Sequence, residues 1–213
     1  KKWTEYLKRH AYNYIMEYSP MGDWASPQKW TDANSIGAGS VSAITPPVFM
    51  GTGYLYYNYR LLYKIAKALG REEEALSCNS EAEMVKKSFL NTYYNREGWF
   101  AKNSQASNAF ALLLHMVEGE EKQKVLRNLV KDIEANEFHL TTGNLCSRYV
   151  VEVLFEEGYW NEAYRLLTQT SYPSWGYMIE NGATTMWERW ENIEKEGPES
   201  GMASRNHPMS GAV

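Results

Sequence analysis

One carboxylate flanked by indoles is the feature of this chain best suited to chemistry. The segment 182–190 has the sequence GATTMWERW, which places Glu188 between Trp187 and Trp190 and beside Arg189. Large apolar rings remove water from a carboxylate, and a neighbouring cation keeps it ionised. Aromatic rings also cover the apolar faces of a pyranose, while carboxylates carry out the proton transfers of glycoside cleavage. The pattern therefore favours a pocket that binds and cleaves sugars.

Two plainer interpretations apply to the same residues. Trp187 and Trp190 lie three positions apart, so both could belong to the core face of a helix. Glu188 could instead form a surface ion pair with one of three cations, Arg189, Lys195 or Arg205. The tryptophan theme recurs, however, in the polar turns 22–24 (GDW) and 173–176 (PSWG). This recurrence favours the pocket, with Trp175 and Trp187 as its aromatic walls.

Three further residues are candidate sugar contacts. Asp23 is either a turn residue that binds nearby backbone amides or an acceptor for sugar hydroxyls, with Trp24 packed beside the ring. The residues alone leave these two interpretations nearly balanced. His207 precedes Pro208, which suits the first turn of a helix, so its imidazole lies at a helix entrance and could donate to a hydroxyl. A lone histidine is nevertheless more often structural.

Composition narrows the class of function. The 213 residues carry a net charge of −4 with both signs mixed along the chain, and no basic stripe suggests a nucleic-acid partner. No apolar run reaches membrane-spanning length. The four histidines lack the close spacing of a metal site, so we expect neither a metal nor another cofactor. Eight tryptophans and sixteen tyrosines suit either a carbohydrate site or an aromatic helical core.

The periodicity of apolar residues predicts an all-α fold. We expect helices over about 2–18, 46–69, 72–92, 105–117, 120–135, 144–157 and 159–170, with a long loop at 19–45. The segments 105–117 and 144–157 are apolar nearly all round, whereas their neighbours are amphipathic. This alternation predicts an inner and an outer ring of helices. A helical-repeat solenoid is the rival architecture, but no repeat of about 34 residues recurs.

Five segments, in order, resemble the bacterial α-L-rhamnosidase family of inverting glycoside hydrolases. They are 22–24, 139–143 (HLTTG), 172–177 (YPSWGY), 182–190, and Asn206-His207 with Gly211. The resemblance implies an (α/α)₆ toroid of the six-hairpin glycosidase type. Residues 1–213 would form only part of that toroid, since the family's acidic cluster with the general acid and its flanking β-sandwich domains find no match here.

The resemblance also implies roles. Glu188 would be the general base, and the sugar contacts would be Asp23, Trp24, Trp175, Trp187 and His207. The substrate would be a glycoside or polysaccharide with terminal α-L-rhamnose. Alternatives are another (α/α)₆ hydrolase, such as a glucoamylase- or trehalase-like enzyme, and a non-catalytic helical module for carbohydrate binding or scaffolding. Without the acid, residues 1–213 alone should be inactive, and exposed apolar faces of 105–117 and 144–157 should favour self-association.

Overall fold

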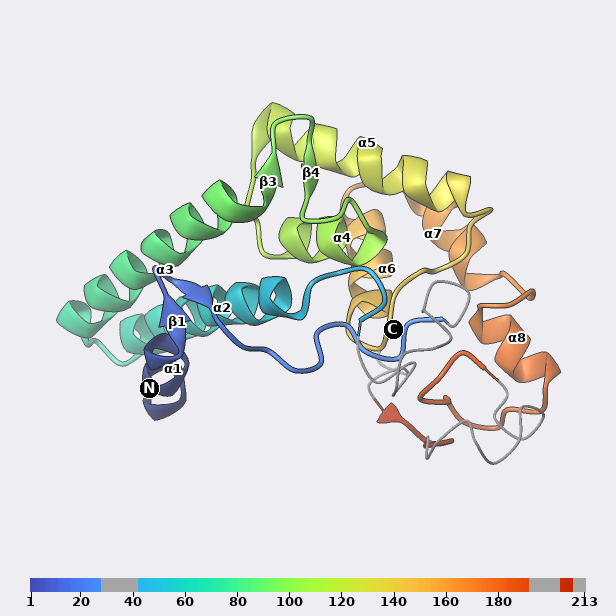
Figure 1. Ribbon diagram of the computed structural model, residues 1–213, viewed down its shortest axis with the longest axis horizontal. Helices are drawn as coiled ribbons and strands as arrows, with labels where there is room; N and C mark the ends of the chain where they lie inside the picture. Colours follow the sequence, from blue (N-terminus) through green and yellow to red (C-terminus); the bar gives the residue numbers. More distant parts are fainter. Residues whose placement is uncertain (28–41, 192–203, 209–213) are drawn as a thin grey trace.

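The computed structural model describes residues 1–27, 42–191 and 204–208 (Figure 1). Within these ranges helices predominate, and the strands are limited to two short hairpins. In chain order the elements are α1 (Lys2–Arg9), β1 (Ala11–Tyr12), β2 (Ile15–Met16), α2 (Pro47–Ala68), α3 (Glu72–Tyr93), β3 (Tyr94–Asn95), β4 (Trp99–Phe100), α4 (Gln105–Leu113), α5 (Gly119–Ala135), α6 (Cys146–Glu156), α7 (Trp160–Leu167) and α8 (Trp175–Glu180).

Three helical hairpins make up most of the molecule. Helix α2 packs along α3, α4 against α5, and α6 against α7. The first members of the hairpins also contact one another in the order α2, α4, α6. Figure 1 accordingly shows α3, α5 and α7 along the outside of an arc, with α2, α4 and α6 inside it. The predicted alternation of inner and outer helices is confirmed.

Local sequence explains where the first hairpin begins and turns. Pro47 occupies the first turn of α2, where its missing N–H is not needed. Gly70 follows the helix with a φ of +67°, a left-handed conformation that glycine adopts without steric cost. Three glutamates, Glu72 to Glu74, then lie in the first turn of α3, where they complement the helix dipole.

Helix α4 is the centre of the core. All of its residues from Gln105 to Leu112 are buried, and Ser104 caps its start by accepting a hydrogen bond from the amide of Ser107. Phe110 packs against Phe49 of α2, with ring centroids 6.0 Å apart. The buried Gln105 side chain donates to the carbonyl of His139 and accepts from the amide of Thr141. Helix α4 therefore fixes the segment that leads into α6.

The structure differs from the predicted elements in several places. The first helix ends at Arg9, and residues up to Met16 form the antiparallel pair β1–β2, with Ala11 opposite Met16. Asn13 and Tyr14 turn this hairpin with φ values of 48° and 66°. The strands β3 and β4 and helix α8 were not predicted, because each is too short to show a period. Most of the predicted loop 19–45 lies outside the described residues.

The apolar faces expected to favour self-association are largely covered within this chain, and self-association stays a prediction. Helices α4 and α6 keep most of their apolar residues inside this chain, because α2, α5 and α7 cover them, although Phe155 of α6 is 45% exposed. The large exposed apolar side chains lie instead mainly on other elements, for example Trp3 on α1, Ile65 on α2 and Trp160 on α7. None of the helices in the described ranges is long and apolar enough to cross a membrane.

Candidate active site

The turn around Asp23 docks onto the segment that begins α6. The Trp24 carbonyl accepts a hydrogen bond of 2.9 Å from the Asn144 amide. Gly143 lies so close to the turn that a Cβ there would overlap the carbonyl oxygens of Asp23 and Trp24. Glycine at 143 therefore permits a backbone contact between segments 120 residues apart in the sequence.

The Asp23 carboxylate secures this contact. One oxygen accepts from the Gly143 amide at 2.7 Å, and the other accepts from the amides of Leu145 and Cys146 at 3.1 and 2.9 Å. The residue is only 1% exposed. Burial raises the pKa of Asp23 to about 6, although the three amide hydrogen bonds lower it in part. This geometry fits the turn interpretation and speaks against the expected contact with a sugar hydroxyl.

The turn at 172–176 and helix α8 form a second side of the site. Ser174 caps α8 by accepting from the amide of Tyr177 at 2.9 Å. A side chain at Gly176 would overlap the Gln169 carbonyl, so the start of α8 also depends on a glycine. The ring of Trp175 lies 5.6 Å from that of Trp190 at an angle of 60°. Helix α8 thus brings Trp175 next to Trp190, in the segment 182–190 that contains Glu188.

Trp190 and Glu191 anchor that segment to its surroundings. The indole N–H of Trp190 donates to the carbonyl of Thr142 at 2.9 Å. Glu191 is buried and accepts from the Tyr172 hydroxyl at 2.6 Å. Glu191 had no expected role, and no spacing rule separates it from the nearby Glu188. Its burial follows from the tertiary contact with Tyr172.

Glu188, the predicted base, belongs to the same segment. It is half-buried, and one carboxylate oxygen accepts from the Ser204 amide at 2.7 Å. The Glu188 amide donates in turn to the Ser204 carbonyl at 2.8 Å. Within the described ranges Glu188 forms no other side-chain hydrogen bond and no ion pair. The guanidinium of Arg205 lies instead over the Trp187 ring, 5.2 Å from its centroid.

These contacts do not support the surface ion-pair interpretation of Glu188 for Arg189 or Arg205. Lys195, the third cation considered, lies outside the described residues. The helical-core interpretation of the two flanking tryptophans also fails, because residues 187–190 are not helical. Both rings are buried all the same, through contacts made by an irregular segment.

His207 joins the site from the far side of the same segment. Its amide donates to the Met186 carbonyl at 2.8 Å, and its ring meets the Trp24 ring edge-on at 6.3 Å. The ring nitrogen Nδ1 is buried and has no hydrogen-bond partner among the described residues. A buried imidazole nitrogen without a partner is costly. It is therefore a candidate position for a ligand hydroxyl.

The structure brings three of the six predicted site residues together around one small cavity, which Asp23, Trp24 and His207 do not line. Glu188, Trp175 and Trp187 line it with Asn144 and Trp190, among others. Its volume is about 10 Å³, near the lower limit of about 10–15 Å³ that one water molecule needs. Trp175 and Trp187 are mostly buried, so little of either ring is accessible to a sugar, whereas Trp24 is half-exposed.

No group of three or more His, Cys, Asp or Glu side chains that could hold a metal occurs in the part of the chain that the structure describes. The absence of a metal and of a cofactor stays a prediction.

Helical hairpins in two layers, with a carboxylate among indoles near the start of an inner helix, are the architecture of a helical glycosidase. The model of the bacterial alpha-L-rhamnosidase 6 hairpin glycosidase domain matches residues 1–213. The chain therefore belongs to this family, and its predicted all-α toroid class is confirmed.

Individual relatives agree with this assignment. An alpha-L-rhamnosidase of Streptomyces avermitilis is 32% identical over 215 residues, which cover 99% of this chain and 19% of that protein. The structure of an alpha-L-rhamnosidase from Dictyoglumus thermophilum superposes with a TM-score of 0.84 at 35% identity, over 99% of this chain and 23% of that one. The structure of the Streptomyces avermitilis enzyme complexed with L-rhamnose superposes with a TM-score of 0.82 at 30% identity, over 98% of this chain and 19% of that one.

The chain thus spans about a fifth of the length of these relatives, between 19% and 23%. The relatives named here are all alpha-L-rhamnosidases, so they favour neither a glucoamylase- or trehalase-like enzyme nor a non-catalytic module.

Proposed function

We propose that this chain is the part of an inverting α-L-rhamnosidase that carries the general base, Glu188. The observation that carries the proposal is the position of this carboxylate. One oxygen is held by the Ser204 amide, and the side chain borders an aromatic cavity near the size of one water molecule. The other oxygen is available to accept a proton from such a water. The family and its L-rhamnose complex support the choice of sugar.

In the proposed reaction a water oxygen attacks the anomeric carbon on the face opposite the leaving group. The water proton passes to Glu188, the glycosidic C–O bond breaks, and an acid protonates the departing oxygen. We assign that acid to residues outside 1–213, because the relatives are about four to five times as long as this chain. Residues 1–213 alone should therefore not hydrolyse an aryl rhamnoside at a measurable rate.

His207, Trp24, Trp175 and Trp187 are the proposed sugar contacts. His207 has the most direct support, because its Nδ1 is buried without a partner and its ring lies against the half-exposed Trp24. For Trp175 and Trp187, contact would be limited to the small exposed part of each ring. We expect His207→Ala to raise KM for a rhamnoside more than it lowers kcat.

The decisive experiment replaces Glu188 in the full-length protein. Glu188→Gln should lower kcat for an aryl rhamnoside by about two to four powers of ten and leave binding of L-rhamnose largely intact. In Glu188→Ala, azide can attack in place of water, and the product should be the β-L-rhamnosyl azide. Glu180→Gln, an exposed carboxylate on α8, is the matched control and should behave as wild type. A Glu188→Gln protein with most of its activity would refute the assignment.

A further inference from the structure

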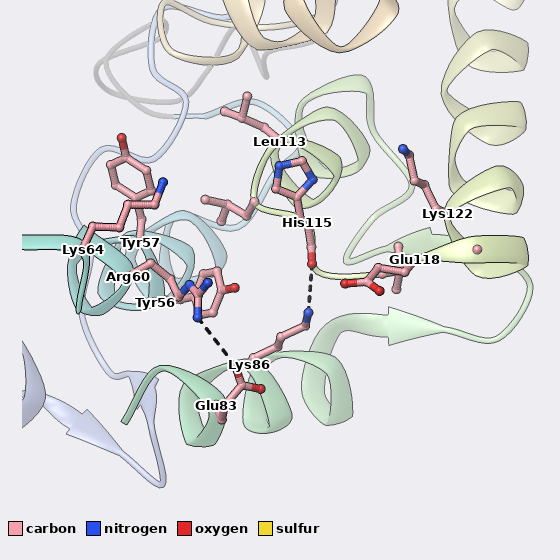
Figure 2. A pocket seen from close by; sticks show the side chains of 13 residues that line it. Tyr56, Tyr57, Arg60, Lys64, Glu83, Lys86, Leu113, His115, Glu118 and Lys122 are labelled. Atoms are coloured by element: carbon pink, nitrogen blue, oxygen red, sulfur yellow. Dashed lines mark hydrogen bonds and ion pairs between the residues drawn. The ribbon is translucent and has the colours of Figure 1, made fainter. Parts of the chain in front are cut away.

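A second cavity lies at the other end of the inner helices. Its volume is about 650 Å³, within the range of small-molecule sites. It takes Tyr56 and Lys64 from α2, Lys86 from α3, and His115 and Glu118 from the α4–α5 turn. Figure 2 shows these side chains around a common space between the three elements. The cavity borders the end of α4, whereas Gln105 at the start of α4 contacts the candidate active site. A nine-residue helix is about 13 Å long, so the two sites are separate.

Some charged side chains of this cavity have an ion-pair partner and others do not. Arg60 is paired with Glu83 at 4.0 Å and donates to Asn79 at 2.8 Å, and Lys122 is paired with Glu157. Lys86 donates to the His115 carbonyl at 2.9 Å, which leaves its charge uncompensated (Figure 2). Lys64 and Glu118 form no ion pair with any described residue. The lining therefore offers two unbalanced cations and one free carboxylate.

Tyr56 adds a hydrogen-bond donor to the lining of the cavity. Its side chain is 7% exposed, it lines the cavity, and its hydroxyl makes no hydrogen bond with the described residues. Burial raises the pKa of Tyr56, with Arg60 acting in the opposite direction, so the hydroxyl is protonated and can donate at neutral pH. The hydroxyl is not one of the buried polar atoms without a partner, so it is accessible from the cavity and can donate to a molecule bound there. The neighbouring Tyr57 is 44% exposed and offers a ring face.

We propose that this cavity is a non-catalytic binding site for a saccharide that carries a carboxylate, such as a uronic acid residue of an acidic polysaccharide. Lys64 and Lys86 would supply the positive charge that attracts the carboxylate, Glu118 would accept from sugar hydroxyls, and the tyrosines would supply a donor and a ring face. A bare phosphate fits less well, because Glu118 and Glu83 would repel its higher charge. The choice of a saccharide rests on the proposed function.

The test measures binding to the full-length protein by calorimetry at low ionic strength. The probes are trigalacturonic acid and the neutral trisaccharide maltotriose, with inorganic phosphate as competitor. We expect trigalacturonic acid to bind at least tenfold more tightly than maltotriose. Lys64→Glu should weaken its binding tenfold or more, and Tyr56→Phe should weaken it about fivefold through the loss of one hydrogen bond. Lys87→Glu makes the same charge change at an exposed position beside Lys86 and outside the cavity, and it should leave binding unchanged.

Four results would overturn the inference: no binding of trigalacturonic acid, equal binding of maltotriose, displacement by phosphate at an equal concentration, or an equal loss in Lys87→Glu. Hydrolysis of an aryl rhamnoside should be unchanged in all three variants. Failure of the binding test with intact hydrolysis would therefore refute this site alone, whereas absent hydrolysis in the wild type would refute the proposed function.

Discussion

Replacement of Asp23 tests how the candidate active site is held together. Asp23→Ala removes the acceptor of three buried amides, those of Gly143, Leu145 and Cys146. A buried donor without a partner costs about 1–3 kcal/mol, so the loss should lie at about 3–5 kcal/mol after some relaxation. That is a large part of the 5–15 kcal/mol by which a typical domain is stable.

Asp23→Asn should be milder, for a reason visible in the geometry. The amides of Leu145 and Cys146 bind the same carboxylate oxygen, which the asparagine oxygen can replace. The asparagine NH₂ would then face the Gly143 amide, and two donors cannot bind each other. One hydrogen bond is lost, at a cost of about 1–3 kcal/mol. The expected order of stability is wild type, Asp23→Asn, Asp23→Ala.

The pH dependence of these losses has a defined sign. Burial raises the pKa of Asp23 from 3.8 to about 6 in the folded protein, so the folded state binds more protons than the unfolded state between these values. This group therefore makes the wild type less stable as the pH rises through that interval. Neither variant has the titrating group. The destabilisation by each variant should be about 1 kcal/mol smaller at pH 7 than at pH 5.

Urea denaturation followed by tryptophan fluorescence at pH 5 and pH 7 measures the stability loss in Asp23→Ala, the loss in Asp23→Asn and the change of both losses with pH. Glu180→Gln is the control for loss of a carboxylate. Kinetics on an aryl rhamnoside complete the test, and KM of Asp23→Asn should stay near that of the wild type. A normal stability combined with a raised KM would show that Asp23 contacts the sugar after all. A destabilisation that grows with pH would refute the assigned direction of the pKa.

Three other changes probe the same region. Gly143→Ala should destabilise the protein by about 1–3 kcal/mol, because its Cβ would overlap the carbonyls of Asp23 and Trp24; an unchanged urea midpoint would contradict the close approach. Trp190→Phe keeps an aromatic ring, though a smaller one, but leaves the Thr142 carbonyl without its donor, so we expect a loss of about 1–3 kcal/mol; a fully stable variant would show that this bond is dispensable. Prolonged treatment with a chelator should leave rhamnoside hydrolysis unchanged, and activity restored by added calcium or zinc would reveal a metal site.

Helix-terminating residues and the spacing of apolar residues explain what could be predicted from the sequence. Helix α2 begins at Pro47 and ends before Gly70, as expected. Apolar residues on nearly all sides of α4 correctly indicated that this helix is buried. Both signals are local, because they depend on backbone conformation or on helical spacing. Residues 11–16 were assigned to the first helix, although they form a pair of two-residue strands. Segments this short show no apolar period that could distinguish a strand pair from the continuation of a helix.

The role of Asp23 could not be decided in the same way. Its sequence context allows a turn residue and a sugar ligand equally, and the difference depends on amides 120 residues away. The same holds for Glu188 and Glu191, which stand three positions apart. One borders a cavity, and the other is buried against Tyr172. Tertiary contacts alone separate a candidate base from a structural carboxylate here.

Many of the contacts that hold the surroundings of the candidate base together meet in the segment before α6. Asp23 binds its amides, Trp190 binds the Thr142 carbonyl, and Gln105 holds the preceding turn through His139 and Thr141. These bonds use backbone groups of a buried segment, which have few alternative partners and little freedom to move. A carboxylate that must face one water molecule gains from such fixed surroundings more than from a flexible surface ion pair. Glu188 accordingly accepts from a backbone amide beside a cavity lined by indoles, while the guanidinium of Arg205 lies on Trp187.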